Sequence, residues 1–334
     1  MRGERVFHAS APVRLDFAGG WTDVAPFAAI ERGVVVNAAI DLRAHAEVEP
    51  GGSGYRLEAD ELDRRTEVHG GNWTEEQTAD FALQKAALQR SGMTAAVLRT
   101  RSDVPPGSGL GSSGALGVAL VAALDAAAGA RRNPAELAEA AFQLEAVDAA
   151  LPGGKQDQYA AALGGFHRLG FHAGRVEVHP LSLDPAIAAA LEERIVVCYT
   201  GTSRVSSKTI ARVMRAYEAN NAVVVAALRG MVEIAERMVE ALRAGDLAAV
   251  GHLLSRNWSC QQQLDPAMCT PDMARLEAAM RDAGAVGGKA AGAGAGGSMF
   301  FLAATGAATL TRVAEAAGAR VLPFRWATEG VRAR

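Results

Sequence analysis

The chain is poor in several residue types that mark common protein classes. It has three cysteines, Cys198, Cys260 and Cys269, and no Cys-x-x-Cys pair, so a disulfide framework and a zinc site built on such pairs are excluded. The seven histidines show no zinc spacing either. A net charge of -3 leaves no basic excess of the kind that binds nucleic acid. The sparse, odd cysteine count is typical of a reducing compartment, and we expect a cytoplasmic protein.

Long apolar runs are also missing. The longest, Gly114 to Leu124, ends at Asp125 and is too short to cross a bilayer. The first residues are charged and no apolar stretch follows them, so no signal peptide and no membrane partner are expected. What remains is a 334-residue chain that is 49% hydrophobic and 21% charged. This composition is typical of a globular protein with one large or two modest domains.

The most informative segment is a glycine- and serine-rich loop at residues 105–114, which runs directly into a small-residue helical stretch, Ala115–Ala128. Glycines let the backbone approach a ligand closely, and the start of a helix offers free N–H groups and a positive dipole end. Together they predict an anion site, most simply for phosphate. Ser112 and Ser113 stand where the helix begins and could cap it or coordinate a metal.

Two other nucleotide-binding loops and a simple turn are alternatives for this segment. A Walker A loop requires Gly-Lys-Ser/Thr at its end, and no lysine is near Gly111. The spacing Gly109-x-Gly111-x-x-Gly114 fits a dinucleotide fingerprint, but residues 103–106 separate it from the preceding strand, contrary to that motif. A second match, at residues 292–297, follows a helical pattern instead of a strand. An NAD or FAD site is therefore not expected, and an ordinary Gly-rich turn is the plainer alternative.

The order of predicted elements indicates an α+β protein with two lobes that meet near residue 165. Strand patterns dominate the first hundred residues and helical patterns the region after residue 206. A capping box at Thr74 predicts a helix that ends at Ser91-Gly92, and a proline in the first turn predicts another helix start near Asn133. The predicted strands are Val6–Phe17, Gly33–Val48, Tyr55–Ala59, Arg65–His69, Thr94–Arg101, Phe166–Gly170, Val176–His179, Arg194–Thr200, Ser298–Ala303 and Arg320–Phe324. The predicted helices after residue 206 are Ser206–Gln263, broken at Gly245, then Pro271–Ala283 and Ala307–Gly318.

Residues 12–23 carry the second candidate constellation. Arg14 lies within an apolar strand, where a charge is costly unless it is paired. A Gly-Gly turn then leads to Thr22 and Asp23, whose polar groups could hold substrate hydroxyls. The alternatives are an edge-strand arginine in solvent and an aspartate that serves only as a helix cap.

Glu145, together with residues 153–159, forms the third constellation. Glu145 falls near the end of one helix, and Asp157 follows a glycine turn at the start of the next segment. One carboxylate could hold Mg²⁺, which prefers oxygen ligands, while the other accepts a proton or orients a hydroxyl. Two solvated acids at helix ends are the alternative. A further glycine-rich stretch at residues 287–298 could back a phosphate, allow close packing or be a flexible connector.

Taken in order, residues 12–23, 106–113, 153–158 and 288–297 resemble the motifs of the GHMP kinases, small-molecule kinases that include galactokinase and mevalonate kinase. The resemblance implies a two-lobed fold. A ribosomal-protein-S5-like N-terminal lobe would span residues 1–165, and a ferredoxin-like C-terminal lobe with a Gly-rich loop at 287–297 would span 166–334. It also implies ATP and Mg²⁺ as cosubstrate and cofactor, and a small-molecule substrate.

The resemblance implies roles for single residues. Asp157 is similar to the aspartate beside the acceptor hydroxyl, and Arg14 to the basic residue that pairs with it. Ser113 and Glu145 are similar to the metal-binding pair. The implied ATP loop consists of Pro106, Gly107, Ser108, Gly109, Leu110, Gly111, Ser112 and Ser113. The implied substrate-binding residues are Gly20, Trp21, Thr22, Asp23, Lys155, Gln156, Ser203, Arg204 and Gly294, of which Lys155 and Arg204 are expected to meet a sugar phosphate.

Within the family, residues 17–23, 36–41, 154–160 and 199–204 resemble heptose 7-phosphate kinases, which phosphorylate the anomeric C1 hydroxyl of a sugar phosphate to give a bisphosphate. Where the heptose kinases usually have Gly-Gly-Gly, this chain has Gly19-Gly20-Trp21. That triplet resembles the Gly-Gly-Trp of L-fucokinase, which acts on an unphosphorylated sugar. An octose 8-phosphate kinase of lincosamide antibiotic biosynthesis and a non-catalytic sugar- or ATP-sensing homologue are further alternatives. The oligomeric state is left open, with a homodimer as one option.

Overall fold

Two β-sheets organise the chain, whose computed structural model describes residues 5–201 and 207–334. Within these residues an eight-stranded sheet has the order β12-β1-β2-β5-β3-β4, with β6 on β2 and β7 on β6, and a second sheet has the order β11-β8-β10-β9. The mixed helix and strand content confirms the α+β class. The strands are β1 (Phe7–Ala18), β2 (Gly33–Pro50), β3 (Tyr55–Ala59), β4 (Arg64–Val68), β5 (Ala96–Ser102), β6 (Phe166–His172), β7 (Arg175–Pro180), β8 (Ile195–Tyr199), β9 (Ala285–Ala290), β10 (Ser298–Ala303), β11 (Arg320–Val321) and β12 (Arg332–Ala333).

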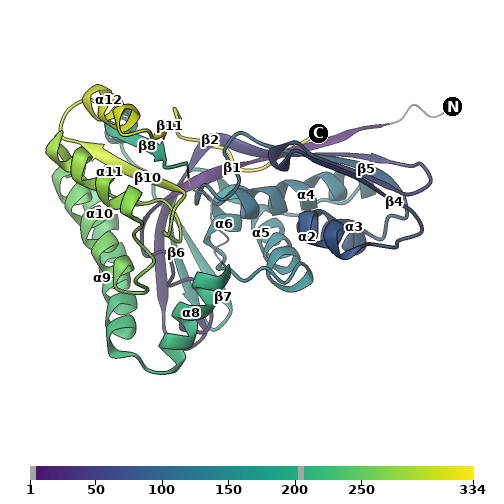
Figure 1. The fold of residues 1–334 in the computed structure, drawn as a ribbon, viewed down its shortest axis with the longest axis horizontal. Coiled ribbons are helices and arrows are strands. Elements are labelled where there is room, and N and C mark those ends of the chain that lie inside the picture. Colours follow the sequence, from purple (N-terminus) through teal and green to yellow (C-terminus); the bar gives the residue numbers. More distant parts are fainter. Residues whose placement is uncertain (1–4, 202–206) are drawn as a thin grey trace.

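The helices divide between the two sheets. Helices α2 to α6 lie along one face of the first sheet (Figure 1). Helices α10 and α11 pack on β9 of the second sheet, and α9 packs on α10 and against β1 and β2 of the first. The helices are α1 (Phe27–Ile30), α2 (Glu75–Asp80), α3 (Ala82–Ser91), α4 (Ser112–Ala128), α5 (Pro134–Phe142), α6 (Gln156–Leu163), α7 (Pro185–Arg194), α8 (Ser207–Glu218), α9 (Ala222–Ala244), α10 (Leu247–Gln262), α11 (Pro271–Asp282) and α12 (Ala308–Ala316), with short helices η1 (Asp60–Leu62) and η2 (Gln143–Asp148). In the described residues, no helix is both long and apolar enough to span a membrane.

Strand β2 joins the parts of the first sheet. Its first half pairs with β6 and its second half with β5, while β1 pairs along its length. Strands β1 to β5 precede residue 165, and β6 and β7 follow it, yet all of them belong to the first sheet. The division into lobes at residue 165 stays a prediction.

Local signals set several helix starts. Thr74 forms the predicted capping box with Gln77. The helix predicted at Asn133 begins there with Pro134 in its first turn, and Asn133 also forms a capping box with Glu136. The helix that begins after Thr74 is not continuous, however, because it breaks at Phe81 into α2 and α3. The chain after α5 also differs from expectation: it continues as one π-helical stretch, η2.

The ladder between β1 and β2 is irregular between Pro12 and Val13 and again between Asp16 and Ala18. Such irregularities re-aim side chains and are frequent beside active sites. Arg14 and Asp16 lie between the two breaks, two residues apart, so they share one face of the strand. Both are nearly fully buried.

Candidate active site

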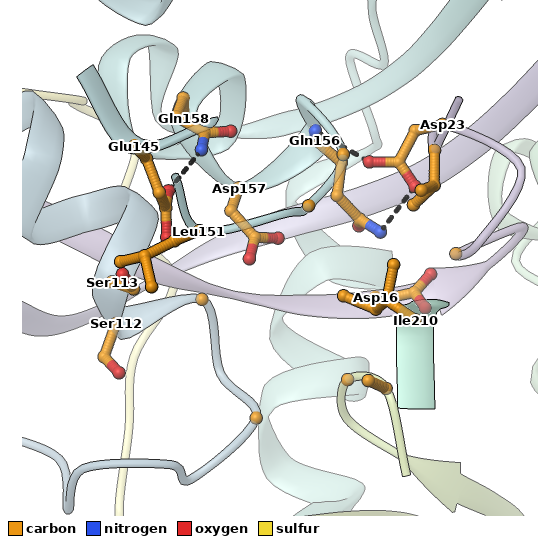
Figure 2. A pocket seen from close by; sticks show the side chains of 18 of the residues that line it. Asp16, Asp23, Ser112, Ser113, Glu145, Leu151, Gln156, Asp157, Gln158 and Ile210 are labelled. Carbon is orange, nitrogen blue, oxygen red and sulfur yellow. Dashed lines mark hydrogen bonds between the residues drawn. The ribbon is translucent and has the colours of Figure 1, made fainter. Parts of the chain in front are cut away.

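A pocket of about 520 Å³ lies where β1, the start of α4, η2 and the start of α6 meet the glycine-rich turn after β9. Figure 2 shows Ser112, Ser113 and Glu145 on one side of it. Asp16, Asp23 and Gln156 lie on the other side, and Asp157 stands between the two groups. The predicted site residues that line the pocket are Arg14, Gly20, Trp21, Asp23, Pro106, Gly107, Gly109, Gly111, Ser112, Ser113, Glu145, Gln156 and Asp157.

The loop before α4 forms one end of the pocket. Gly111 precedes the helix with a φ of 78°, a conformation that a residue with a Cβ adopts only at a cost. Ser112 and Ser113 are the first residues of α4 and line the pocket. The unpaired N–H groups of the first helical turn therefore stand at this end, as an anion site requires.

The second glycine-rich segment packs directly on this loop. The Ser298 N–H donates to the Ser108 carbonyl at 2.7 Å. A Cβ added at Gly292 would lie 2.3 Å from the Gly109 carbonyl oxygen. Any residue larger than glycine would therefore clash with the loop. Of the three readings for residues 287–298, close packing is the one observed. Gly294 itself does not line the pocket and packs instead on Met268.

Arg14 connects both glycine segments to Asp157. Its Nε and Nη2 both lie 2.8 Å from Asp157 Oδ1. Its Nη1 donates to the carbonyls of Gly109 at 2.7 Å and Ala291 at 2.9 Å. The Arg14 side chain is 5% exposed and the Asp157 side chain 29%. The guanidinium is thus fixed by the fold, while the carboxylate remains open to the pocket.

Glu145 lies on the π-helical stretch η2, a rare geometry that is frequent at functional sites. Gln158 Nε2 donates to its Oε2 at 2.6 Å. Burial raises the pKa of Glu145 to about 7, opposed by a hydrogen bond from Ser113 and reinforced by the charge of Asp157. The carboxyl therefore lacks a cationic partner in the described residues, although it contacts the first turn of α4.

Asp23 lies at the opposite end, fixed by the start of α6. The Gln156 N–H donates to Asp23 Oδ2 at 3.0 Å. A Cβ at Gly154 would lie 1.9 Å from the same oxygen, so the glycine turn makes room for this carboxylate. Burial raises the pKa of Asp23 to about 6, and the charges of Asp157 and Asp16 contribute to that rise.

Trp21 lies between these polar groups and an apolar cluster. It is 5% exposed and packs among residues that include Val24 and Phe27. Its φ is 82°, a left-handed conformation that is strained for a bulky residue. The indole Nε1 is buried without a hydrogen-bond partner among the described residues. A strained residue with an unused donor at a pocket wall points to a functional constraint.

Several predicted site residues do not reach the pocket. The Lys155 ammonium donates to both oxygens of Glu139 at 2.8 Å, and its contact with a sugar phosphate stays a prediction. The Thr22 hydroxyl is used by the turn, because it donates to Gly19 and accepts from the Val34 N–H. Ser108 and Leu110 belong to the loop before α4 but are fully buried. Ser203 and Arg204 lie outside the described residues.

Two charged residues were missed by the sequence analysis. Lys289 of β9 donates to the Asp16 main-chain carbonyl at 2.6 Å and to Asp16 Oδ2 at 2.8 Å. Both are essentially fully buried, and Asp16 lines the pocket. The available signal was a charge inside each of two apolar strands, the same signal that marked Arg14.

Comparison with known proteins agrees with this geometry. A family model described as the GHMP kinases N terminal domain matches residues 76–165, and one described as the GHMP kinases C terminal matches residues 238–320. A D-glycero-alpha-D-manno-heptose 7-phosphate kinase of Campylobacter jejuni is 30% identical over 89% of each chain. The chain belongs to the GHMP kinase family. That membership confirms the predicted two-lobed kinase fold and makes ATP its cosubstrate.

Other relatives agree on the fold and differ in the names they carry. The crystal structure of a heptose 1-phosphate kinase from Bacteroides thetaiotaomicron superimposes with a TM-score of 0.80 at 25% identity, covering 98% of each chain. A bifunctional fucokinase/GDP-fucose pyrophosphorylase of Arabidopsis thaliana is 28% identical over 87% of this chain and 29% of its own length. Galactokinase of Lactococcus lactis shares the fold alone, with a TM-score of 0.74 at 18% identity.

Proposed function

We propose that this GHMP kinase transfers the γ-phosphoryl group of ATP to the anomeric C1 hydroxyl of a sugar phosphate, such as a heptose 7-phosphate. The observation that carries the proposal is the polarity of the pocket. A helix start and glycine loop lie at one end, carboxylates and an amide lie at the other, and the Arg14–Asp157 pair lies between them (Figure 2). The heptose kinase relatives support the acceptor class.

The loop end suits the triphosphate. Backbone N–H groups of the loop and of the first turn of α4 donate to phosphate oxygens, and the helix dipole favours their negative charge. Because Gly292 and Ser298 hold the loop from behind, its amides are oriented before ATP binds. Phosphoryl transfer depends mainly on such positioning and on charge stabilisation.

Ser113 and Glu145 would hold Mg²⁺ at this end. The hydroxyl and the carboxylate are the hard oxygen donors that this ion prefers. The raised pKa of Glu145 reflects a charge without a cationic partner in the described residues, which is what a divalent cation would supply. No cluster of three His, Cys, Asp or Glu exists in the described part of the chain, so phosphate oxygens and water would complete the shell. When bound, Mg²⁺ neutralises charge on the transferring phosphate.

Asp157 and Arg14 act where the two ends meet. Asp157 accepts the proton of the anomeric hydroxyl as the oxygen attacks the γ-phosphorus and the bond to the β-phosphate oxygen breaks. Arg14 orients the Asp157 carboxylate through two contacts of 2.8 Å and stabilises negative charge on the transferring group. The Asp23 carboxylate accepts hydrogen bonds from sugar hydroxyls, and the Gln156 amide both donates to them and accepts from them.

A second candidate is a kinase of an unphosphorylated sugar, similar to fucokinase. The observation that favours it is the charge of the acceptor end. Of the pocket lining that the structure describes, Arg14 is the only basic residue, and Asp157 occupies it. Trp21, which the fucokinase motif shares, also lines this end. An octose phosphate kinase differs from the first proposal only in the length of the sugar.

The experiment is ADP release with Mg²⁺ and ATP over a panel of heptoses, octoses and L-fucose, each with and without its terminal phosphate. We expect a heptose 7-phosphate to give the highest kcat/KM, with a sugar-free blank as the control. A preference for free L-fucose would replace the first proposal with the second. ATP binding without ADP release on any sugar would contradict both and favour a sensing role. A cytoplasmic location and a homodimer stay predictions.

A further inference from the structure

Asp16 is a buried carboxylate that faces the acceptor end of the pocket with half of its bonding capacity unused. It is 2% exposed and lines the pocket. Its Oδ2 accepts from Lys289 Nζ at 2.8 Å, whereas its Oδ1 has no hydrogen-bond partner among the described residues. A buried acceptor is normally paired, with protein, water or ligand. The unpaired oxygen therefore requires an explanation outside the described chain.

Lys289 holds this carboxylate in place. Its ammonium is 0% exposed and also donates to the Asp16 main-chain carbonyl at 2.6 Å. Burial lowers the pKa of Lys289, and the nearby Arg14 adds to that effect, while Asp16 opposes it. Buried ion pairs of this kind add little net stability over an apolar pair of the same volume. A function for the charge of Asp16 accounts for the pair better than stability does.

Two other residues that line the acceptor end, Gln156 and Trp21, also carry polar atoms without a hydrogen-bond partner among the described residues. A Cβ at Gly20 would lie 2.2 Å from Asp16 Oδ2 and 3.1 Å from Gln156 Nε2, so both side chains close on the same glycine. Gln156 Oε1 and Trp21 Nε1 are likewise buried without partners among the described residues. Two acceptors and one donor thus belong to residues that line the acceptor end, where Figure 2 shows Asp16 and Gln156 on the same side of the pocket. This arrangement matches a polyol, which both donates and accepts hydrogen bonds.

We propose that Asp16 is a second carboxylate acceptor for the sugar, separate from Asp23, and that it selects sugars by demanding a hydroxyl at one defined position. Lys289 is its positioning residue. The inference rests on the proposed function, because it needs a sugar in the pocket. A site built to hydrogen-bond a hydroxyl rejects the analogue that lacks it, since a buried polar group is then left unpaired.

The test couples a change in the sugar to a change in the enzyme. Monodeoxy analogues of the best acceptor, from the heptose 7-phosphate or the L-fucose series, are assayed by ADP release. We expect one position at which the wild type loses at least about 100-fold in kcat/KM. Asp16→Asn should lose about 10- to 100-fold on the parent sugar and only a few-fold more on that one deoxy analogue. Its penalties at every other position should match those of the wild type.

Two further variants separate specificity from folding. Asp16→Asn leaves Lys289 buried without its counter-charge, so the double variant D16N/K289M, which removes both charges, is assayed beside it. It should melt cooperatively and show the same loss of discrimination. Asp282→Asn, on the exposed end of α11, is the matched control and should retain the wild-type penalty at every position.

The outcomes distinguish the inference from the proposed function. A wild type that phosphorylates no sugar contradicts the proposed function, and the inference with it. An active wild type that tolerates every monodeoxy analogue within about tenfold overturns the inference alone. So does a folded D16N or D16N/K289M enzyme that keeps the full penalty at the sensitive position, because Asp16 would then be a structural tie between β1 and β9.

Discussion

The phosphate end and the acceptor end of the pocket are formed by different kinds of chemical group. Apart from Glu145 of η2, the phosphate end consists of backbone, glycine and the short side chains of Ser112 and Ser113, contributed by one contiguous stretch of chain. The acceptor end consists of buried charged and amide groups from segments far apart, with Asp16 and Lys289 separated by 273 positions. Backbone amides bind phosphate in any family member, whereas side chains define one sugar. The common chemistry is therefore local in sequence and the specificity is not.

The largest expected effect falls on the junction between the ends. Asp157→Asn should lower kcat by about 10²–10⁴, the usual contribution of a positioned proton acceptor, while ATP affinity stays within about threefold of the wild type. Single-turnover rates and nucleotide titration measure the two quantities. Asp282→Asn is the control. A near-normal kcat for Asp157→Asn contradicts its role.

At the phosphate end, Glu145→Gln should raise the Mg²⁺ concentration required for half-maximal rate by at least about 10- to 100-fold, the loss typical even of indirect partners of a metal. The KM for sugar should stay unchanged, because Glu145 lies away from Asp23 and Gln156 (Figure 2). Mg²⁺ titrations at saturating ATP measure the change. Glu315→Gln, on exposed α12, is the matched control, and an equal Mg²⁺ requirement in both variants would contradict the assignment.

At the acceptor end, Trp21→Gly should raise the KM for sugar about tenfold, because one wall of the pocket is lost, and leave the KM for ATP within about twofold. The backbone itself accommodates the change, since glycine readily adopts the φ of 82° found there. Steady-state kinetics with each substrate varied in turn test this. Trp73→Gly, a partly buried tryptophan beside Tyr55, controls for loss of aromatic volume. Equal shifts in both KM values would contradict the separation of the two ends.

The smallest effect is on the pH dependence of stability without ligands. Burial raises the pKa of Asp23 to about 6 from its ordinary 3.8, so the folded state binds this proton more tightly than the unfolded state. Its contribution to stability is present at acidic pH and is lost as pH rises through about 6. Relative to the wild type, Asp23→Asn should gain melting temperature between pH 4.5 and pH 7. The exposed Asp282→Asn should show a constant difference, and a flat profile for Asp23→Asn would show that the carboxylate is not destabilised by burial.

Much of this arrangement could be predicted from the sequence, because its determinants are local. Glycine spacing predicted the loop at residues 105–114. The capping box at Thr74 and the proline after Asn133 marked two helix starts that the structure confirms. Hydrophobic runs located β1 and β2 to within a few residues.

The remainder depends on pairing between distant segments, which a local pattern does not contain. Lys155 was predicted as a cationic contact for the sugar phosphate, and its observed partner is Glu139, 16 residues earlier. The partner of Asp16 lies on the strand of the second sheet that brings Lys289 beneath β1. The π-helical stretch that carries Glu145, whose carboxyl contacts Ser113, packs on α3 and α4.

The central claim, that the pocket joins an ATP end to a sugar end through Asp157, is tested most directly by locating the new phosphate in the product. Phosphorus–proton correlation in NMR spectra of the product formed from the best acceptor identifies the carbon that carries it. We expect coupling to the anomeric proton, with the signal absent for Asp157→Asn over the same period. Phosphate on any other carbon, or an equal product yield from Asp157→Asn, would contradict it.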